Sequence, residues 1–184
     1  MLLSDEVVRL APMDSTHVDF ITDVRTDWAN YEYFFDFHLS SREQELRWIA
    51  EVTQDPSQAN FVIYPVESPD QPVGTISLTS IDRRSRNAEY GRIYLSAAAR
   101  GANMMQRASV ILLRYGFDEL NLHKIYLRVF SDNERAARMY RGLGFEEEGR
   151  MRQQVYKDGV YRDVTYMAVF ADAFRQAPVG PIIK

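Results

Sequence analysis

One stretch of the sequence decides the fold: Ser131-Asp132-Asn133-Glu134-Arg135-Ala136-Ala137-Arg138-Met139-Tyr140-Arg141-Gly142-Leu143-Gly144-Phe145. The preceding residues 125–130 are branched and aromatic, which favours a strand. An asparagine can cap the first main-chain N–H groups of a helix, and glycine is common where a helix ends. The stretch therefore predicts a short helix after Asn133 and a new strand from Phe145. Asn133 and Tyr140 lie seven residues apart, which places them on one helix face.

Apolar periodicity and turn residues outside this stretch predict further strands and helices. Lys157-Asp158-Gly159 predicts a hairpin turn between the last two strands. The order of these elements predicts an α/β protein with a mixed sheet and helices on both faces. Strands are expected at 7–11, 61–64, 73–81, 88–95, 124–130, 145–155 and 161–170, and helices at 14–27, from 41 onward and at 104–120.

Length and composition limit the class of protein. The 184 residues, 46% of them apolar, fit one domain over residues 1–176 with a flexible tail at 177–184. A net charge of -4 and a pI near 5.4 give no reason to bind nucleic acid, and they slightly favour a cationic or neutral small substrate. There is no cysteine, and the three histidines are scattered, so we propose no metal. Without a signal peptide or about 20 consecutive apolar residues, the protein is expected in the cytoplasm and not in a membrane.

The stretch from Ser131 to Phe145, placed after a strand, resembles the C-terminal signature of the GNAT acyl-CoA N-acyltransferases. The likeness extends over about residues 7–174. It implies the GNAT fold, with a mostly antiparallel sheet of about seven strands flanked by helices on both faces. It also implies acetyl-CoA as co-substrate and a small-molecule amine as acceptor. By analogy with this branch, we expect a homodimer that pairs through the late strands.

The family holds the CoA diphosphate in a loop of Gln or Arg, two residues, Gly, one residue, then Gly or Ala. The matching stretch here is Arg100-Gly101-Ala102-Asn103-Met104-Met105. Arg100 fits, but Asn103 replaces the first glycine and Met105 replaces the small residue. Asn tolerates a positive φ, so Asn103 can keep the turn. The resemblance therefore assigns CoA binding to residues 100–104, and the alternative is a helix start that merely caps.

The strand before this loop carries the next roles that the resemblance implies. The main chain of Ile93, Tyr94 and Leu95 is expected to contact pantetheine and the thioester oxygen. Glu89 resembles the acidic residue that accepts the amine proton in many members. The alternative is a strand carboxylate paired with Arg83, Arg84 or Arg86. Arg92 stands as an extra residue relative to the usual strand.

The helix from the opening stretch carries the remaining catalytic role. Tyr140 is expected to return a proton to the leaving thiolate, because a phenol with a pKa of about 10 can protonate a thiolate whose acid has a pKa of about 8.5. The alternative is a tyrosine that only packs in the core. Asn133, Ala136 and Ala137 are expected to contact CoA, although capping and helix propensity alone explain these residue types.

The acceptor is suggested by two regions. Residues 28–39 are dense in aromatic rings, which stack on sugars or hold cations, and Tyr31, Tyr33 and Phe34 are expected to bind the substrate. The alternative is that these rings are core. Residues 77–96 look like the nucleotide-linked amino-sugar N-acetyltransferases of pseudaminic acid biosynthesis. Residues 148–164 are also shared with spermidine N-acetyltransferases and RimJ/RimL-type protein N-terminal acetyltransferases.

The leading expectation is therefore acetylation of a primary amine on an amino sugar. A polyamine or a protein N-terminus is the alternative within the same class. A GNAT-fold binding module that no longer acetylates is the alternative of another class, and it is motivated by Asn103 and Met105.

Overall fold

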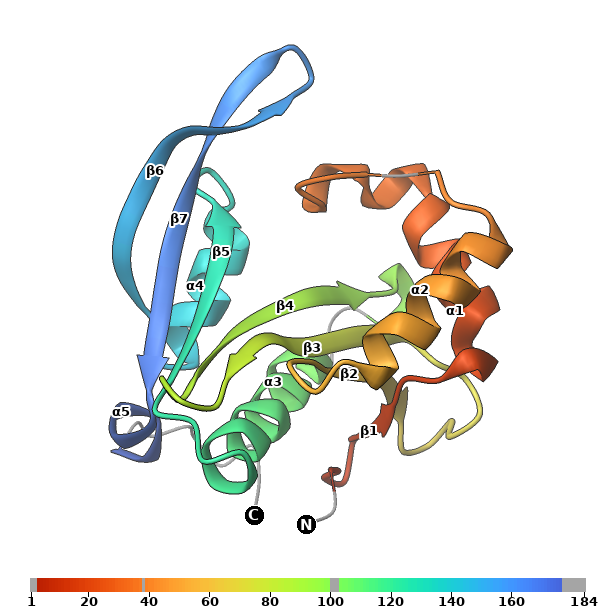
Figure 1. The fold of residues 1–184 in the computed structure, drawn as a ribbon, viewed down its shortest axis with the longest axis horizontal. Helices are drawn as coiled ribbons and strands as arrows, with labels where there is room; N and C mark the ends of the chain where they lie inside the picture. The colour runs from red at the N-terminus through yellow and green to blue at the C-terminus, as the bar shows by residue number, and fades with distance from the viewer. Residues whose placement is uncertain (1–2, 38, 100–102, 177–184) are drawn as a thin grey trace.

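The computed structural model describes residues 3–37, 39–99 and 103–176 (Figure 1). Seven strands form one sheet in the order β1-β2-β3-β4-β5-β7-β6. Neighbouring strands are antiparallel except β4 and β5, which are parallel. The strands are β1 (Val8–Pro12), β2 (Ala59–Pro65), β3 (Gly74–Asp82), β4 (Asn87–Leu95), β5 (Lys124–Phe130), β6 (Glu146–Lys157) and β7 (Val160–Phe170).

Two of the longer helices begin at a residue whose side chain caps them. Ser41 and Gln44 form a complete capping box at the start of α2, and the Asn133 side chain caps α4. Among the described residues, no helix is long and apolar enough to cross a membrane. The helices are η1 (Ser15–His17), α1 (Val18–Thr26), η2 (Trp28–Tyr33), α2 (Arg42–Gln54), η3 (Ala97–Ala99), α3 (Met104–Arg114), η4 (Tyr115–Glu119), α4 (Glu134–Gly142) and α5 (Ala171–Gln176).

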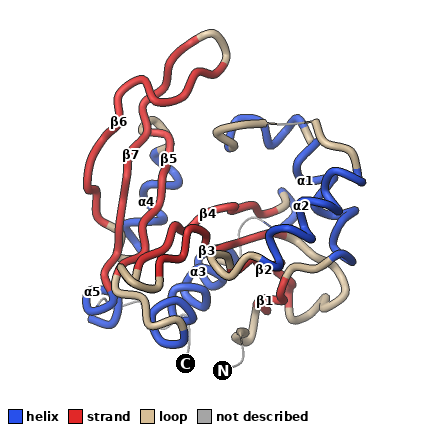
Figure 2. The backbone as a smooth tube through the Cα atoms, in the orientation of Figure 1, coloured by secondary structure: helices blue, strands red, loops and turns tan. Residues whose placement is uncertain are grey.

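Helices cover both faces of the sheet (Figure 2). Successive strand residues point to opposite faces, and β2 shows this directly. Val62 packs in a cluster with residues of α1 and α2, whereas Phe61 and Ile63 pack in the larger core with α3. The larger core also contains Tyr140 of α4 and Phe174 of α5. The predicted fold class, a mixed and mostly antiparallel seven-stranded sheet between helices, is confirmed.

Several predicted boundaries differ from the structure. The helix expected at 104–120 is α-helical only to Arg114 and continues as one π-helical turn, η4. The helix expected from residue 14 begins with the 3-10 turn η1, and α5 was not predicted. The hairpin turn is confirmed, with positive φ at Asp158 and Gly159. The tail expected at 177–184 lies outside the described residues.

The central feature of the sheet is the separation of its two parallel strands. The register of β4 and β5 pairs Asn87 with Lys124, Ala88 with Ile125 and Glu89 with Tyr126, and it ends there. Beyond these three pairs the strands diverge into a V (Figure 1). In the part of the chain that the structure describes, β4 therefore has no strand neighbour on this side after Glu89.

Gly74 offers a test of how tightly β3 holds β4. A Cβ atom on Gly74 would lie 2.4 Å from the main-chain oxygen of Tyr94, which cannot move without shifting β4. We expect Gly74→Ala to lower the free energy of unfolding by about 1–3 kcal/mol, as measured by urea denaturation.

Gly142→Ala is the matched control, because the nearest atom to its Cβ would be Gln106 Nε2 at 4.0 Å. Alanine is also the better helix former, so this variant should gain up to about 1 kcal/mol. Equal stability of the two variants would contradict the close packing of β3 on β4.

Candidate active site

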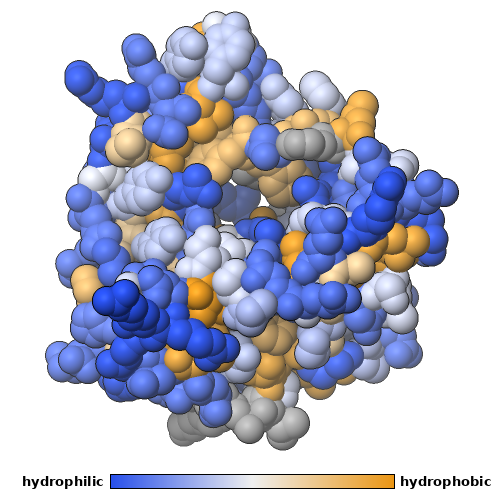
Figure 3. All heavy atoms as spheres, viewed as in Figure 1, coloured by the Kyte–Doolittle hydropathy of each residue, from blue (hydrophilic) through white to orange (hydrophobic). Residues whose placement is uncertain are grey.

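A cavity of about 740 Å³ lies where β4 and β5 separate. It is visible as a hollow near the middle of the face shown in Figure 3. Its walls come from β4, the end of β5, α4, the first turn of α3 and the segment after η2. Among the lining residues are Phe34, Phe35, Glu89, Arg92, Ile93, Tyr94, Leu95, Met105, Arg128, Phe130, Asn133, Ala136 and Tyr140.

A β-bulge shapes the wall that β4 provides. The register pairs Ser77 with Gly91 and Thr75 with Tyr94, so β4 has one more residue than β3 between these pairs. Arg92 lies in this bulge with a φ of +51°, and its carbonyl oxygen accepts a hydrogen bond from Thr75 Oγ1 at 2.8 Å. The extra residue expected at Arg92 is therefore a bulge that redirects the strand and its side chain.

Tyr140 lies deep in the cavity wall and is only 6% exposed. The ring contacts those of Tyr90 and Phe145 edge-on, with centroid distances of 6.1 and 5.9 Å. Burial raises the pKa of Tyr140, so its phenol is neutral near pH 7. The Tyr90 hydroxyl bonds to Ser109 Oγ at 2.6 Å, whereas the Tyr140 hydroxyl has no hydrogen bond within the described ranges. Tyr140 is thus a core residue that also lines the cavity with a neutral phenol.

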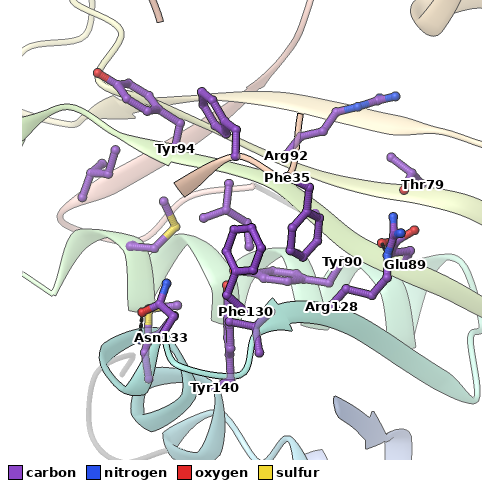
Figure 4. Close-up of a pocket in the computed structure, with 18 of the residues that line it drawn as sticks. Phe35, Thr79, Glu89, Tyr90, Arg92, Tyr94, Arg128, Phe130, Asn133 and Tyr140 are labelled. Atoms are coloured by element: carbon purple, nitrogen blue, oxygen red, sulfur yellow. Dashed lines mark hydrogen bonds and ion pairs between the residues drawn. The ribbon is translucent and has the colours of Figure 1, made fainter. Parts of the chain in front are cut away.

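Glu89 lines the same cavity and forms an ion pair. Its Oε1 accepts a hydrogen bond from Arg128 Nε at 2.7 Å. Figure 4 shows the two side chains meeting at one end of the cavity, with Asn133 at the other. The partner expected for Glu89 among Arg83, Arg84 and Arg86 was wrong, because the neighbouring strand β5 supplies it. Arg86 bonds Asn121 instead.

The cap of α4 contributes the predicted CoA-binding residues. Asn133 Oδ1 accepts a hydrogen bond from the Ala136 main chain at 3.0 Å, which leaves its amide nitrogen available at the cavity wall. Ala136 lines the cavity beside it. Ala137 is not among the lining residues, so the structure does not bring it to this site, because its position on the helix turns away.

The start of α3 bears on the predicted CoA loop. Asn103 adopts the left-handed conformation with a φ of +52°, as its residue type allows, and its side chain makes no capping hydrogen bond. The first main-chain N–H groups of α3 are therefore not capped by this side chain, as anion binding requires. Met104 is buried in the core, and Met105 lines the cavity. Arg100, Gly101 and Ala102 lie outside the described residues.

The segment after η2 closes the cavity from the side of α1 and α2. Phe34 lines the main cavity and a second cavity of about 350 Å³, and Phe35 packs edge-on against Phe130 at 4.7 Å. Tyr31 lines neither cavity, contrary to expectation, because its ring stacks on Trp28 and its hydroxyl bonds Asp158 at 2.9 Å. The side chain of Tyr33 lies outside the described part of the structure.

Lys157 fixes this segment to the hairpin of β6 and β7. Its buried Nζ donates hydrogen bonds to the carbonyl oxygens of Tyr31 and Phe34, the latter at 2.6 Å. The Nζ also lies 4.1 Å from the centre of the Tyr31 ring. Desolvation and the nearby Arg162 lower the pKa of Lys157. This contact joins two segments that are more than a hundred residues apart.

Sequence reasoning missed several residues of the site. Arg128, Phe130 and Trp48 were not predicted, and Arg92 was noted only as an extra residue. The residue pattern does not reveal which side chains face one another across neighbouring strands. The positive φ at Arg92 likewise cannot be predicted from the residue type, because arginine rarely adopts it.

Comparison with known proteins agrees with this architecture. The family model of the acetyltransferase (GNAT) domain matches residues 8–146. Spermidine N(1)-acetyltransferase of Escherichia coli K12 is 29% identical over 163 residues, covering 89% of this chain and 86% of that protein. The putative ribosomal N-acetyltransferase YdaF of Bacillus subtilis is 30% identical over 96 residues, which is 52% of each chain.

Solved structures show the same fold. The crystal structure of spermidine N-acetyltransferase from Vibrio cholerae in complex with CoA and spermine superposes with a TM-score of 0.86 at 25% identity. The match covers 92% of this chain and 98% of that one. The family model spans most of the sequence, and a solved structure shares the fold. The chain therefore belongs to the GNAT family of acetyltransferases.

Proposed function

We propose that this chain transfers the acetyl group of acetyl-CoA to the primary amine of a small molecule. One observation carries this proposal: the Tyr140 phenol and the Glu89 carboxylate line a single cavity at the point where β4 and β5 separate. A proton donor and a proton acceptor at one cavity are what amide formation from a thioester requires.

The residues present fit acetyl-CoA. The V between β4 and β5 exposes a strand edge, and the first turn of α3 lacks a side-chain cap. Asn133 and Ala136 would hold the pantetheine side, while the α3 N-terminus would take the diphosphate. The acetyl-CoA thioester supplies the activated acetyl group. The likeness to the V. cholerae spermidine N-acetyltransferase in complex with CoA, at a TM-score of 0.86, supports this assignment.

The roles of the side chains follow from their chemistry. The amine nitrogen loses a proton as it gains the acetyl carbon, and Glu89 accepts that proton. The departing sulfur gains a proton from Tyr140. The raised pKa of Tyr140 keeps the donor protonated between turnovers. Phe35 and Phe130 limit the access of water to this step.

The relatives bear on the acceptor class. The amino-sugar acceptor suggested by residues 77–96 finds no support in the comparisons. The polyamine alternative does, because relatives in E. coli and V. cholerae are named spermidine acetyltransferases. A polyamine is therefore the first acceptor class to test. A binding module without activity is disfavoured, since Asn103 keeps the helix start and Met105 forms part of the cavity wall.

Thiol release from acetyl-CoA, measured with a panel of amines, tests the proposed reaction. We expect turnover with at least one small primary amine and none with tertiary amines, which have no proton for Glu89 to accept. The panel opens with spermidine and includes amino sugars and an N-terminal peptide. Absence of turnover across the panel, despite acetyl-CoA binding by calorimetry, would contradict the proposal.

Tyr140→Phe tests the proton donor. The ring packing against Tyr90 and Phe145 is kept, and the hydroxyl makes no hydrogen bond within the described residues, so the fold should be unchanged. We expect kcat to fall by about 100-fold or more, with the Kd for acetyl-CoA unchanged. Undiminished kcat would remove Tyr140 from this role.

Glu89→Gln tests the proton acceptor, and Arg128→Gln separates that role from the ion pair. If Glu89 accepts the proton, Glu89→Gln should lower kcat by about 100-fold, whereas Arg128→Gln should cost about tenfold or less. Steady-state kinetics at saturating acetyl-CoA measures both. Equal losses in the two variants would show that Glu89 acts through the pair with Arg128.

A further inference from the structure

Arg92 stands at the boundary between the two cavities and lines both of them. Its Nη1 donates hydrogen bonds to Gln58 Oε1 and to Asn60 Oδ1, the latter at 2.6 Å. Its guanidinium lies 5.1 Å from the centre of the Trp48 ring. These contacts hold the charged group in a defined place on the side of the sheet covered by α1 and α2.

Arg92 differs from its cationic neighbours in what it pairs with. Arg25 pairs with Glu45 at 3.2 Å, and Arg128 pairs with Glu89 at 2.7 Å. Within the described residues, no carboxylate lies within 4.0 Å of Arg92, and both of its hydrogen bonds to amide oxygens use Nη1. A guanidinium has five N–H donors, so Nε and Nη2 still have donors for a ligand.

The backbone at Arg92 is costly for this residue type. A φ of +51° is unfavourable for an arginine, and glycine or asparagine would adopt it more easily. Strained positions of this kind gather at functional sites, and a bulge redirects a side chain. Here the bulge places the Arg92 side chain at the cavity wall on the side of α1 and α2, which we call the acceptor side.

The charged side chains around the two cavities are of both signs and are not predominantly acidic. The charged residues that line the two cavities are Asp36, Asp55 and Glu89 and, of the opposite sign, Arg25, Arg92, Arg128 and Arg135. A polyamine carries several positive charges, which these arginines repel. An acceptor with one amine and one acid group matches both signs, with the acid near Arg92 and the amine near Glu89.

We propose that Arg92 binds an anionic group on the acceptor, so that this chain acetylates a short aliphatic amine that also carries a carboxylate or a phosphate-type group. The inference rests on the proposed acetyl transfer, and it departs from the polyamine acceptor named for the relatives. A guanidinium suits both kinds of anion, because its paired donors match two oxygens at once.

Acceptors matched in length test the proposal. We would compare 4-aminobutanoate, 3-aminopropylphosphonate, 1,4-diaminobutane and butylamine in the thiol-release assay. With the wild-type protein, kcat/KM for at least one of the two acids should exceed that for the diamine by about tenfold or more, since a charged hydrogen-bonded pair replaces a repulsion. The carboxylate and phosphonate arms show which anion fits.

Two variants assign the preference to Arg92. Arg92→Asn removes the charge and tolerates the positive φ, and it should raise KM for the acids by about tenfold with little change in kcat or in KM for acetyl-CoA. Arg92→Glu should reverse the preference, so that the diamine becomes the better acceptor. Arg84→Asn, on the exposed β3–β4 turn, is the control and should change nothing.

The outcomes separate this inference from the proposed reaction. If the wild-type protein prefers the diamine and Arg92→Glu does not alter the order, the inference is wrong while acetyl transfer stands. Calorimetry of the acids with CoA present adds a readout that needs no turnover. Tighter binding of an acid to the wild type than to Arg92→Glu supports the inference, and equal or undetectable binding overturns it.

Discussion

The structure depends on one constraint, the early end of the pairing between β4 and β5. Three register pairs, from Asn87 to Glu89, join these strands, and beyond them each strand runs along its own side of a V. A strand edge in the middle of a sheet is costly unless its polar groups find partners. A bound ligand with amide groups of its own can supply such partners. The interruption of the sheet is therefore what makes room for both the cavity and the transfer reaction.

The V is held at a fixed width by contacts across it. At its closed end, the pair of Glu89 and Arg128 joins β4 to β5. On the acceptor side, Phe35 packs on Phe130, and Lys157 binds two carbonyl oxygens of the segment after η2. The hairpin of β6 and β7 is thus tied to the region between α1 and α2. Because these contacts join segments distant in the sequence, the acceptor side depends on the complete fold and not on one loop.

Signals that act over a few residues predicted the helices, strands and turns well. They did not predict which of these elements contact one another. The cap at Asn133, the helix start at residue 41 and the turn at Gly159 depend on a few residues each, and all three are present as expected. The partner of Glu89 and the place of Tyr31 depend on which strands and loops become neighbours, and both expectations were wrong. Arg92 was visible as an extra residue, but its bulge needed the register with β3. Long-range pairing is the information that a single sequence does not display.

The choice of acceptor also depends on contacts at the site rather than on a property of the whole chain. Taken as an average over the whole surface, the net charge of -4 favours a cationic or neutral substrate. Beyond about 10 Å, however, salt screens exposed charges, so a bound acceptor responds mainly to the groups that touch it. At the acceptor side, Arg25 and Arg128 are each matched by a carboxylate, and Arg92 is matched by amide oxygens only. Among the described residues on this side, Arg92 is therefore the guanidinium that no carboxylate pairs with, and an anionic group on the acceptor can take that place. The proposed recognition of the acceptor therefore depends on a strained residue on β4, Arg92, rather than on the overall acidity of the chain.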